Sequence, residues 1–266
     1  MVHAEVADVN ILVTFALERE FAPWRALRTF RREQDTSSAR LPVPVFCSEA
    51  GSARLRVAIT GMGPQAAEQA MTSLLTEPPE VCISAGLAGG LRAQHRSGDV
   101  LLARAVRALD ADRQLVCDSG LLSASRFLSC RIAELFLNSP RIIRFAWEKR
   151  RLGRQADAVE MESLAVLEAA RRCGSAVLAV RAIADTCDQD LPYDFGQFVD
   201  VHGQPKPSRA VAAVARQPLR LPALLRLNRQ SRQAAEALCR FLEDYVQLLP
   251  QLLAHPAEAP EGVAAT

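Results

Sequence analysis

The sequence has 266 residues, 49% of them hydrophobic and 23% charged, which predicts a single α/β domain with one substantial core. Its net charge of only +2 argues against a strong positive field, and therefore against a nucleic-acid partner. Seven cysteines without a CxxC pair, and a start without a basic and apolar signal segment, argue against a disulfide framework or a metal site and favour a cytoplasmic protein with reduced thiols.

Short β-branched runs alternate along the chain with longer segments of helical periodicity. This alternation is typical of a mostly parallel sheet whose strands are joined by crossover helices. In such sheets, ligands bind beyond the carboxyl ends of the strands. In chain order we expect a strand at 10–14, a helix at 17–30, strands at 43–48 and 55–60, a helix at 64–75, strands at 81–85 and 99–106, a helix at 124–137, a strand at 141–145, a helix at 161–173 and a strand at 176–184.

The character of the sequence changes after residue 200. From Gly203 to Arg232 there is no acidic residue, while lysine and arginine recur among Leu, Ala and Pro. Two interpretations stay open: a solvated face of C-terminal helices, or a surface for anionic lipid or an acidic partner. We therefore expect a domain at 8–200, a basic helical extension at 201–254 and a disordered tail at 255–266, which is rich in Pro, Ala and Glu.

Glycines and acids follow several of the predicted strands. The segments GMGP and GLAGGL, at residues 61–64 and 86–91, are not GxGxxG and are not followed by Lys-Ser/Thr, which argues against a dinucleotide or ATP site. They are either ordinary turns or places where bare backbone N–H groups meet a ligand. Because the carboxyl ends of parallel strands meet at one edge, we expect these segments to converge on one site.

Three acids lie near the same predicted edge. Glu160 and Glu162 either complement the dipole of the helix that begins there or serve a ligand, and the apolar neighbours of Glu162 favour burial with a partner. Asp185 ends an apolar strand and is either a helix cap or a carboxyl group whose raised pKa suits general acid catalysis.

Together, the segments ALERE, GMGP, GLAGGL with GDV, AVEMES and RAIAD resemble the nucleoside phosphorylase/nucleosidase superfamily. The resemblance runs from about residue 10 to 196 in the family's order, and it is strongest to methylthioadenosine/S-adenosylhomocysteine nucleosidases. It implies a three-layer sandwich with a mostly parallel mixed sheet flanked by helices. It also implies cleavage of an adenine-type nucleoside without a metal or other cofactor, in a homo-oligomer.

The resemblance also implies roles for individual residues. Glu162 would accept hydrogen bonds from the ribose hydroxyls while Met161 packs against the sugar. Asp185 would protonate the departing purine, and Glu20 would activate water. The remaining substrate-binding candidates are Glu160, Gly61, Gly63, Gly86, Ala88, Gly89 and, for stacking on the base, Phe145.

Two departures from the family pattern affect the expected reaction. Ser84 and Leu87 stand where phosphorylases of the family carry an Arg and a Ser that hold phosphate, so hydrolysis is favoured over phosphorolysis. The segment between Asp99 and Val159 is short and lacks the usual strand and stacking aromatic, which leaves open a non-catalytic nucleoside-binding protein.

Further features resemble the hopanoid-associated branch of the family. These are the GLAGGL wording, the segment 148–153 and the basic C-terminal helices. That resemblance implies a lipid-linked nucleoside such as adenosylhopane, with peripheral membrane contact through the C-terminal helices. An ordinary nucleoside is the alternative.

Overall fold

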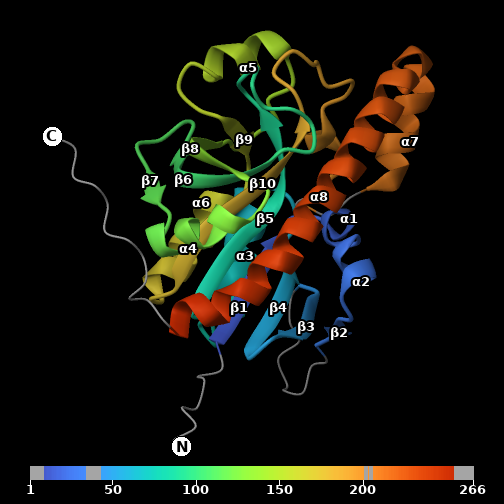
Figure 1. Ribbon diagram of the computed structural model, residues 1–266. Coiled ribbons are helices and arrows are strands. Elements are labelled where there is room, and N and C mark those ends of the chain that lie inside the picture. The colour runs from blue at the N-terminus through green and yellow to red at the C-terminus, as the bar shows by residue number, and fades with distance from the viewer. Residues whose placement is uncertain (1–8, 34–42, 201–202, 204–205, 255–266) are drawn as a thin grey trace, which may run out of the picture.

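The computed structural model describes residues 9–33, 43–200, 203 and 206–254 (Figure 1). The N-terminal part alternates buried strands with short helices. Its elements are β1 (Val9–Phe15), α1 (Glu18–Phe21), α2 (Trp24–Leu27), β2 (Arg31–Arg32), β3 (Val45–Ala50), β4 (Ala53–Ile59), α3 (Pro64–Leu74) and β5 (Val81–Gly90).

The C-terminal part completes the sheet and ends in a long helix. Its strands are β6 (Val100–Ala108), β7 (Gln114–Val116), β8 (Arg131–Asn138), β9 (Ala158–Glu160) and β10 (Ala176–Asp185). Its helices are α4 (Ser119–Ala124), η1 (Ser125–Phe127), α5 (Ala146–Leu152), α6 (Ser163–Arg172), η2 (Phe195–Phe198), α7 (Pro207–Arg216), η3 (Pro218–Arg220) and α8 (Leu221–Ala254).

One mixed sheet runs through the described residues in the order β10-β6-β8-β9-β5-β1-β4-β3-β2, with β7 beside β6 and a further pairing between β10 and β5. Helix α8 crosses one face of this sheet together with α1, α2 and α4, whereas α3 and α6 pack on the other face (Figure 1). Because both faces are covered, β5 and β10 are almost wholly buried, as parallel strands between helical layers usually are. The predicted three-layer α/β architecture is confirmed.

Two predicted elements are wrong. The segment 124–137, predicted as a helix, instead ends α4 and then forms β8, which pairs in parallel with β6 over residues 101–108. Strand pairing here overrides the helical preference of Ala, Glu and Leu, and a short apolar run does not distinguish the two states. The predicted strand at 141–145 is instead a bend followed by irregular chain that leads into α5, and the Ser139 hydroxyl bonds both the N–H and the C=O of Arg141 at its start.

Two other predicted boundaries shift for identifiable reasons. The helix predicted at 17–30 is divided into α1 and α2 around Pro23, which has no N–H to continue the helical ladder. Strand β5, predicted to end at 85, continues to Gly90 because Gly89 and Gly90 pair with β9. The GLAGGL segment is therefore mostly strand rather than turn.

Helix α8 belongs to the same core as the sheet. Its second half buries Leu238, Leu242 and Val246 among the strand side chains, and the Tyr245 hydroxyl donates to the carbonyl of Leu121 at 2.6 Å. The predicted tail at 255–266 lies outside the described residues. None of the helices in the described ranges is long and apolar enough to cross a membrane.

Candidate functional site

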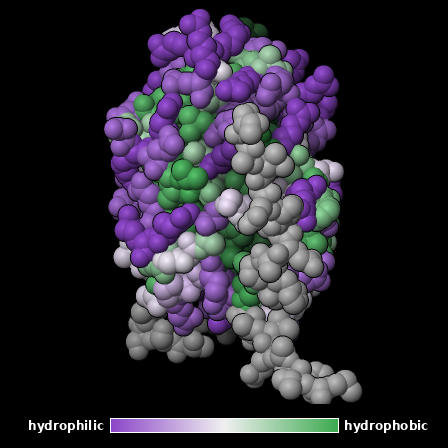
Figure 2. Space-filling view, turned by 60° about the vertical axis from the view of Figure 1, so that its left-hand side comes forward, coloured by the Kyte–Doolittle hydropathy of each residue, from purple (hydrophilic) through white to green (hydrophobic). Residues whose placement is uncertain are grey.

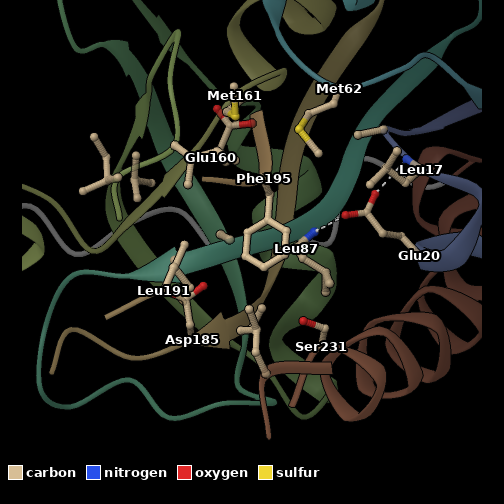
Figure 3. A pocket seen from close by; sticks show the side chains of 18 of the residues that line it. Leu17, Glu20, Met62, Leu87, Glu160, Met161, Asp185, Leu191, Phe195 and Ser231 are labelled. Atoms are coloured by element: carbon tan, nitrogen blue, oxygen red, sulfur yellow. Dashed lines mark hydrogen bonds between the residues drawn. The ribbon is translucent and has the colours of Figure 1, made fainter. Parts of the chain in front are cut away.

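The carboxyl ends of β1, β5, β9 and β10 surround one cavity, which α8 closes from the side (Figure 3). β1, β5 and β10 run parallel and reach this rim with their carboxyl ends, as the parallel topology predicts. The short β9 pairs antiparallel with β5 and brings Glu160 to the same place. The lining includes Leu17, Glu20, Met62, Leu87, Ala88, Gly89, Glu160, Met161, Glu162, Asp185, Leu191, Phe195, Leu227 and Ser231.

Glu162 is held at the junction of β9 and α6 by a glycine backbone. The Gly63 N–H donates to Glu162 Oε1 at 2.8 Å, and Gly63 has a φ of +94°, a conformation that residues with a side chain rarely adopt. Burial, together with the negative charge of Glu160, raises the pKa of Glu162 from 4.5 to about 8. Its other oxygen, Oε2, has no hydrogen-bond partner among the described residues, and Glu162 is one of the residues that line the cavity.

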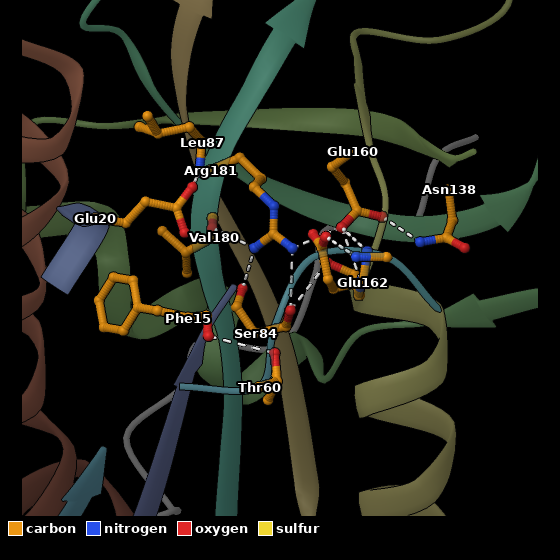
Figure 4. Close-up of polar contacts among 12 residues, drawn as sticks. Phe15, Glu20, Thr60, Ser84, Leu87, Asn138, Glu160, Glu162, Val180 and Arg181 are labelled. Atoms are coloured by element: carbon orange, nitrogen blue, oxygen red, sulfur yellow. Dashed lines mark hydrogen bonds and ion pairs between the residues drawn. The ribbon is translucent and has the colours of Figure 1, made fainter. Parts of the chain in front are cut away.

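Glu160 is committed to the protein rather than to the cavity (Figure 4). Its Oε2 accepts hydrogen bonds from the N–H groups of Glu162 and Ser163 at 3.0 and 2.8 Å, and from the Arg181 guanidinium at 2.6 Å. Its Oε1 accepts from Asn138 Nδ2 at 2.8 Å. The carboxylate therefore caps the start of α6 and fixes the backbone of Glu162.

Arg181 is buried and is not among the residues that line the cavity. It donates to the carbonyl oxygens of Ser84 and Val180 and to the Ser84 hydroxyl, in addition to Glu160. A Cβ atom at Gly86 would lie 3.7 Å from its central carbon and 3.6 Å from Glu20 Oε2. Arg181 and Glu20 therefore both lie on the side of β5 to which a side chain at Gly86 would point, and that side chain would make ordinary van der Waals contact with both.

Glu20 faces the cavity from the start of α1. Its Oε2 accepts from the Leu17 N–H at 3.1 Å and its Oε1 from the Leu87 N–H at 3.3 Å (Figure 3). Burial raises the pKa of the Glu20 carboxyl, although nearby Arg19 and Arg181 act in the opposite direction. A buried carboxyl group of this kind is a stronger base than one in water.

Asp185 stands at the end of β10, paired with a buried lysine. Lys149 of α5 is completely buried, and its Nζ donates to Asp185 Oδ2 and to the carbonyl of Gln189 at 2.7 Å. Burial raises the pKa of the Asp185 carboxyl, and the Lys149 ammonium opposes that rise. Asp185 Oδ1 has no protein hydrogen-bond partner in the described ranges, so it is available to a ligand in the cavity.

The structure brings most of the predicted site residues together. Glu20, Glu160, Met161, Glu162, Asp185, Ala88 and Gly89 line the cavity. Gly61, Gly63 and Gly86 lie behind this lining, where they shape its backbone. Phe145 is not among the lining residues and is 41% exposed at the start of α5.

Sequence reasoning missed several contributors. Lys149, Asn138 and the cavity residues Leu191 and Phe195 were not singled out. Phe195 had a detectable signal, since it is an aromatic residue in the loop after the acid-bearing strand β10. No feature of the sequence pointed to Lys149, because it lies in a run of basic residues that is typical of a solvated helix face. No cluster of three or more His, Cys, Asp or Glu side chains in the described part of the chain could hold a metal ion.

Comparisons with known proteins agree with this geometry. A family model described as the phosphorylase superfamily matches residues 10–138 and 121–216.

Solved structures with a similar fold cover most of the chain. S-adenosylhomocysteine nucleosidase from Streptococcus pyogenes, in complex with 5-methylthiotubericidin, is 16% identical, with a TM-score of 0.70 over 93% of this chain and 100% of that one. The 5′-methylthioadenosine/S-adenosylhomocysteine nucleosidase from Neisseria meningitidis is 17% identical, with a TM-score of 0.67 over 90% and 98%. Futalosine hydrolase of Helicobacter pylori is 15% identical, with a TM-score of 0.66 over 90% and 98%.

Proposed function

Because the chain belongs to the phosphorylase superfamily and is therefore an N-glycosyl hydrolase or pentosyltransferase, we propose that it hydrolyses the N-glycosidic bond of an adenine-type purine nucleoside. The observation that carries this proposal is the single cavity shared by Glu20, Glu162 and Asp185, which come from separate parts of the chain. Glycosidic cleavage passes through an oxocarbenium-like sugar, so it needs a held sugar, a protonated leaving group and a placed nucleophile. The three carboxyl groups can supply these functions.

Glu162 is proposed to hold the ribose. Glu162 lines the cavity, and its Oε2 has no hydrogen-bond partner in the described part of the chain, while Oε1 is fixed by the Gly63 N–H. Ribose hydroxyl groups would donate hydrogen bonds to Oε2, and Met161 beside Glu162 offers an apolar surface to the sugar ring. Gly63 positions these contacts through its backbone N–H, while the Gly61 N–H donates to the carbonyl of Ala16 just after β1.

Asp185 is proposed to serve the leaving base. A carboxyl group whose pKa is raised by burial retains its proton to higher pH, so it can act as a general acid. The apolar side chains of Leu191 and Phe195 flank the same part of the cavity and support an aromatic base there (Figure 3).

Glu20 is proposed to orient and deprotonate the attacking water. Its position also favours water over phosphate, because Glu20 already occupies the Leu87 N–H that an anion would use, and its negative charge would repel a phosphate dianion. The Arg181 guanidinium does not change this conclusion, since Glu160 and Ser84 engage both of its terminal nitrogens.

A second cavity supports a substrate with an extended substituent. It shares Arg19, Leu87, Asn228 and Ser231 with the first and continues between α2 and α8. Much of its lining is apolar, with Pro23, Leu27 and several alanines. A lipid-linked nucleoside could extend its apolar part along this groove, so such a compound belongs among the candidate substrates. The cytoplasmic location and homo-oligomeric assembly stay predictions.

Release of adenine from a panel of nucleosides tests the proposal, with short and long apolar 5′ substituents and with or without phosphate. We expect release without phosphate. Asp185→Asn should lower kcat by on the order of 10²- to 10⁴-fold, because it removes a general acid. Glu162→Gln should chiefly raise KM. Glu68→Gln, which removes an exposed carboxylate from α3, is the matched control and should leave both constants unchanged.

Three outcomes would contradict the proposal. Release that requires phosphate would identify a phosphorylase instead of a hydrolase. Full activity of Asp185→Asn would exclude the role given to that residue. Absence of release across the whole panel, together with tight nucleoside binding, would favour the binding protein.

A further inference from the structure

Helix α7, η3 and the first turns of α8 form a projecting part of the molecule, here named the basic tip and defined as residues 206–229. It extends beyond the sheet at the upper right of Figure 1. Its sequence contains no Asp or Glu, and its basic residues are Lys206, Arg209, Arg216, Arg220, Arg226 and Arg229. Such a segment carries a local positive charge on a chain whose net charge is only +2.

Three of these cations have no partner among the described residues. Arg216, Arg226 and Arg229 are exposed and form no hydrogen bond or ion pair with any described residue. Lys206 is paired with Asp200. Arg209 and Arg220 donate only to backbone carbonyls, which leaves their charge in place. The positive field of the basic tip therefore rests on its five arginines.

The same segment exposes large apolar side chains. Leu219 is 95% exposed, Val211 69% and Leu225 60%. Leu221 and Leu225 are four residues apart and so share one face of α8, whereas Leu224 and Leu227 point into the nucleoside cavity. The first turns of α8 thus have two apolar faces, one that lines the cavity and one that is exposed.

On another part of the surface, several arginines form ion pairs with acids. On the side that carries β7 and β8, which comes forward in Figure 2, the surface is predominantly hydrophilic and its apolar side chains stand in separate patches. Arginines of β6, of the segment before β7 and of α6 are paired there with acids, in Arg104–Glu134, Arg113–Glu168 and Arg171–Asp118. Arg126 of η1, which lies over the exposed Phe127, shows that a cation beside an exposed apolar side chain also occurs elsewhere. The basic tip differs in gathering several such arginines and leucines within one acid-free segment.

We propose that the basic tip docks on an anionic lipid bilayer. Acidic headgroups would neutralise Arg216, Arg226 and Arg229, while Leu219 and Leu225 would enter the boundary between headgroups and acyl chains. A two-fold contact with a second copy fits less well, because it would place the acid-free patch against itself. Nucleic acid would leave the leucines exposed and finds no aromatic side chain in this segment on which to stack a base.

Flotation of the full-length protein with vesicles tests this docking. Vesicles of phosphatidylcholine alone are compared with vesicles that also contain phosphatidylglycerol. We expect binding only to the anionic vesicles, and release at high salt because screening shortens the range of charge attraction. Replacing Arg216, Arg226 and Arg229 together by Gln should weaken binding on the order of a hundredfold, given the contribution of each arginine near an anionic surface.

Two further variants separate docking from charge alone. Leu219→Ser with Leu225→Ser should weaken binding about tenfold or more without a change in charge. Replacing Arg126, Arg154 and Arg172 by Gln removes the same charge from exposed positions outside the basic tip and should leave binding within about twofold of the wild type.

The proposal is overturned by equal binding to both kinds of vesicle, by no binding to either, or by equal losses from the two arginine triples. It is also overturned if Leu219→Ser with Leu225→Ser dissociates a dimer while vesicle binding is absent, because the basic tip would then be an interface between copies. None of these readouts depends on nucleoside cleavage, so they remain decisive if the proposed activity is wrong.

Discussion

The buried pair of Glu160 and Arg181 should govern the stability of the site. Arg181 is 1% exposed and Glu160 4%, and Arg181→Met leaves the Glu160 carboxylate without its cation. Removing one partner of a buried ion pair costs about 3–5 kcal/mol. Since the free energy of unfolding of a typical domain is about 5–15 kcal/mol, this single change should remove a large part of it.

Glu160→Gln should also destabilise, toward the lower end of the same range, because Arg181 keeps its contacts with Ser84 and Val180. The double variant removes both charges, so its loss should be smaller than the sum of the two single losses by about 1–3 kcal/mol. The Gln substitution should also lower the pKa of Glu162, because the charge of Glu160 contributes to raising it.

Urea denaturation of the three variants and the wild type measures these quantities, with an unchanged m-value as the sign that the unfolded state is comparable. Single variants that lose less than about 1 kcal/mol would refute the reasoning, because that is the size of an ordinary surface effect. A double variant equal to the sum of the singles would refute the coupling.

Three further predictions concern the same site. Glu162 loses its proton near pH 4.5 in the unfolded chain but keeps it to about pH 8 in the folded chain, so the free energy of unfolding should fall as pH rises between these values. Urea titrations at several pH values measure this fall, and an equally steep profile for Glu162→Gln would contradict the prediction. Lys149→Met should raise the pKa of Asp185 further, because the Lys149 ammonium lowers it. The alkaline limb of the pH profile of kcat/KM for nucleoside cleavage should then move to higher pH. An unmoved limb would show that Lys149 does not control the protonation of Asp185. Gly63→Ala should cost about 1–3 kcal/mol in unfolding experiments, because its extended positive-φ conformation is normally adopted only by glycine. It should also raise KM for the nucleoside, because the Gly63 N–H holds Glu162; a stability loss with an unchanged KM would separate the backbone from the site.

The sequence was sufficient to predict the framework of the site. Buried apolar runs and the order of the motifs placed the ends of β1, β5 and β10 at one rim, and Glu20, Glu162 and Asp185 meet there. This worked because strand-end geometry is a property of parallel sheets and does not depend on the details of packing.

What could not be predicted depends on pairing across the chain. Strand β8 is defined by its neighbours β6 and β9, and its own residues suit a helix equally well. Lys149 reaches Asp185 from 36 residues away, and a buried lysine looks in sequence like any other member of a basic run. Glu160 was expected to face the substrate, but only the structure shows that four donors already occupy it.

Helix α8 connects the wall of the nucleoside cavity to the interior of the protein. Its first half contributes Leu227 and Ser231 to the cavity. Its second half is anchored by the Tyr245 hydroxyl, which donates to the carbonyl of Leu121, and by the Cys239 thiol, which donates to the carbonyl of Glu20 at 3.3 Å. Because the same helix fills the core with Leu238 and Leu242, a substitution there should also displace the cavity wall. The shape of the substrate pocket is thus coupled to the packing of the protein interior.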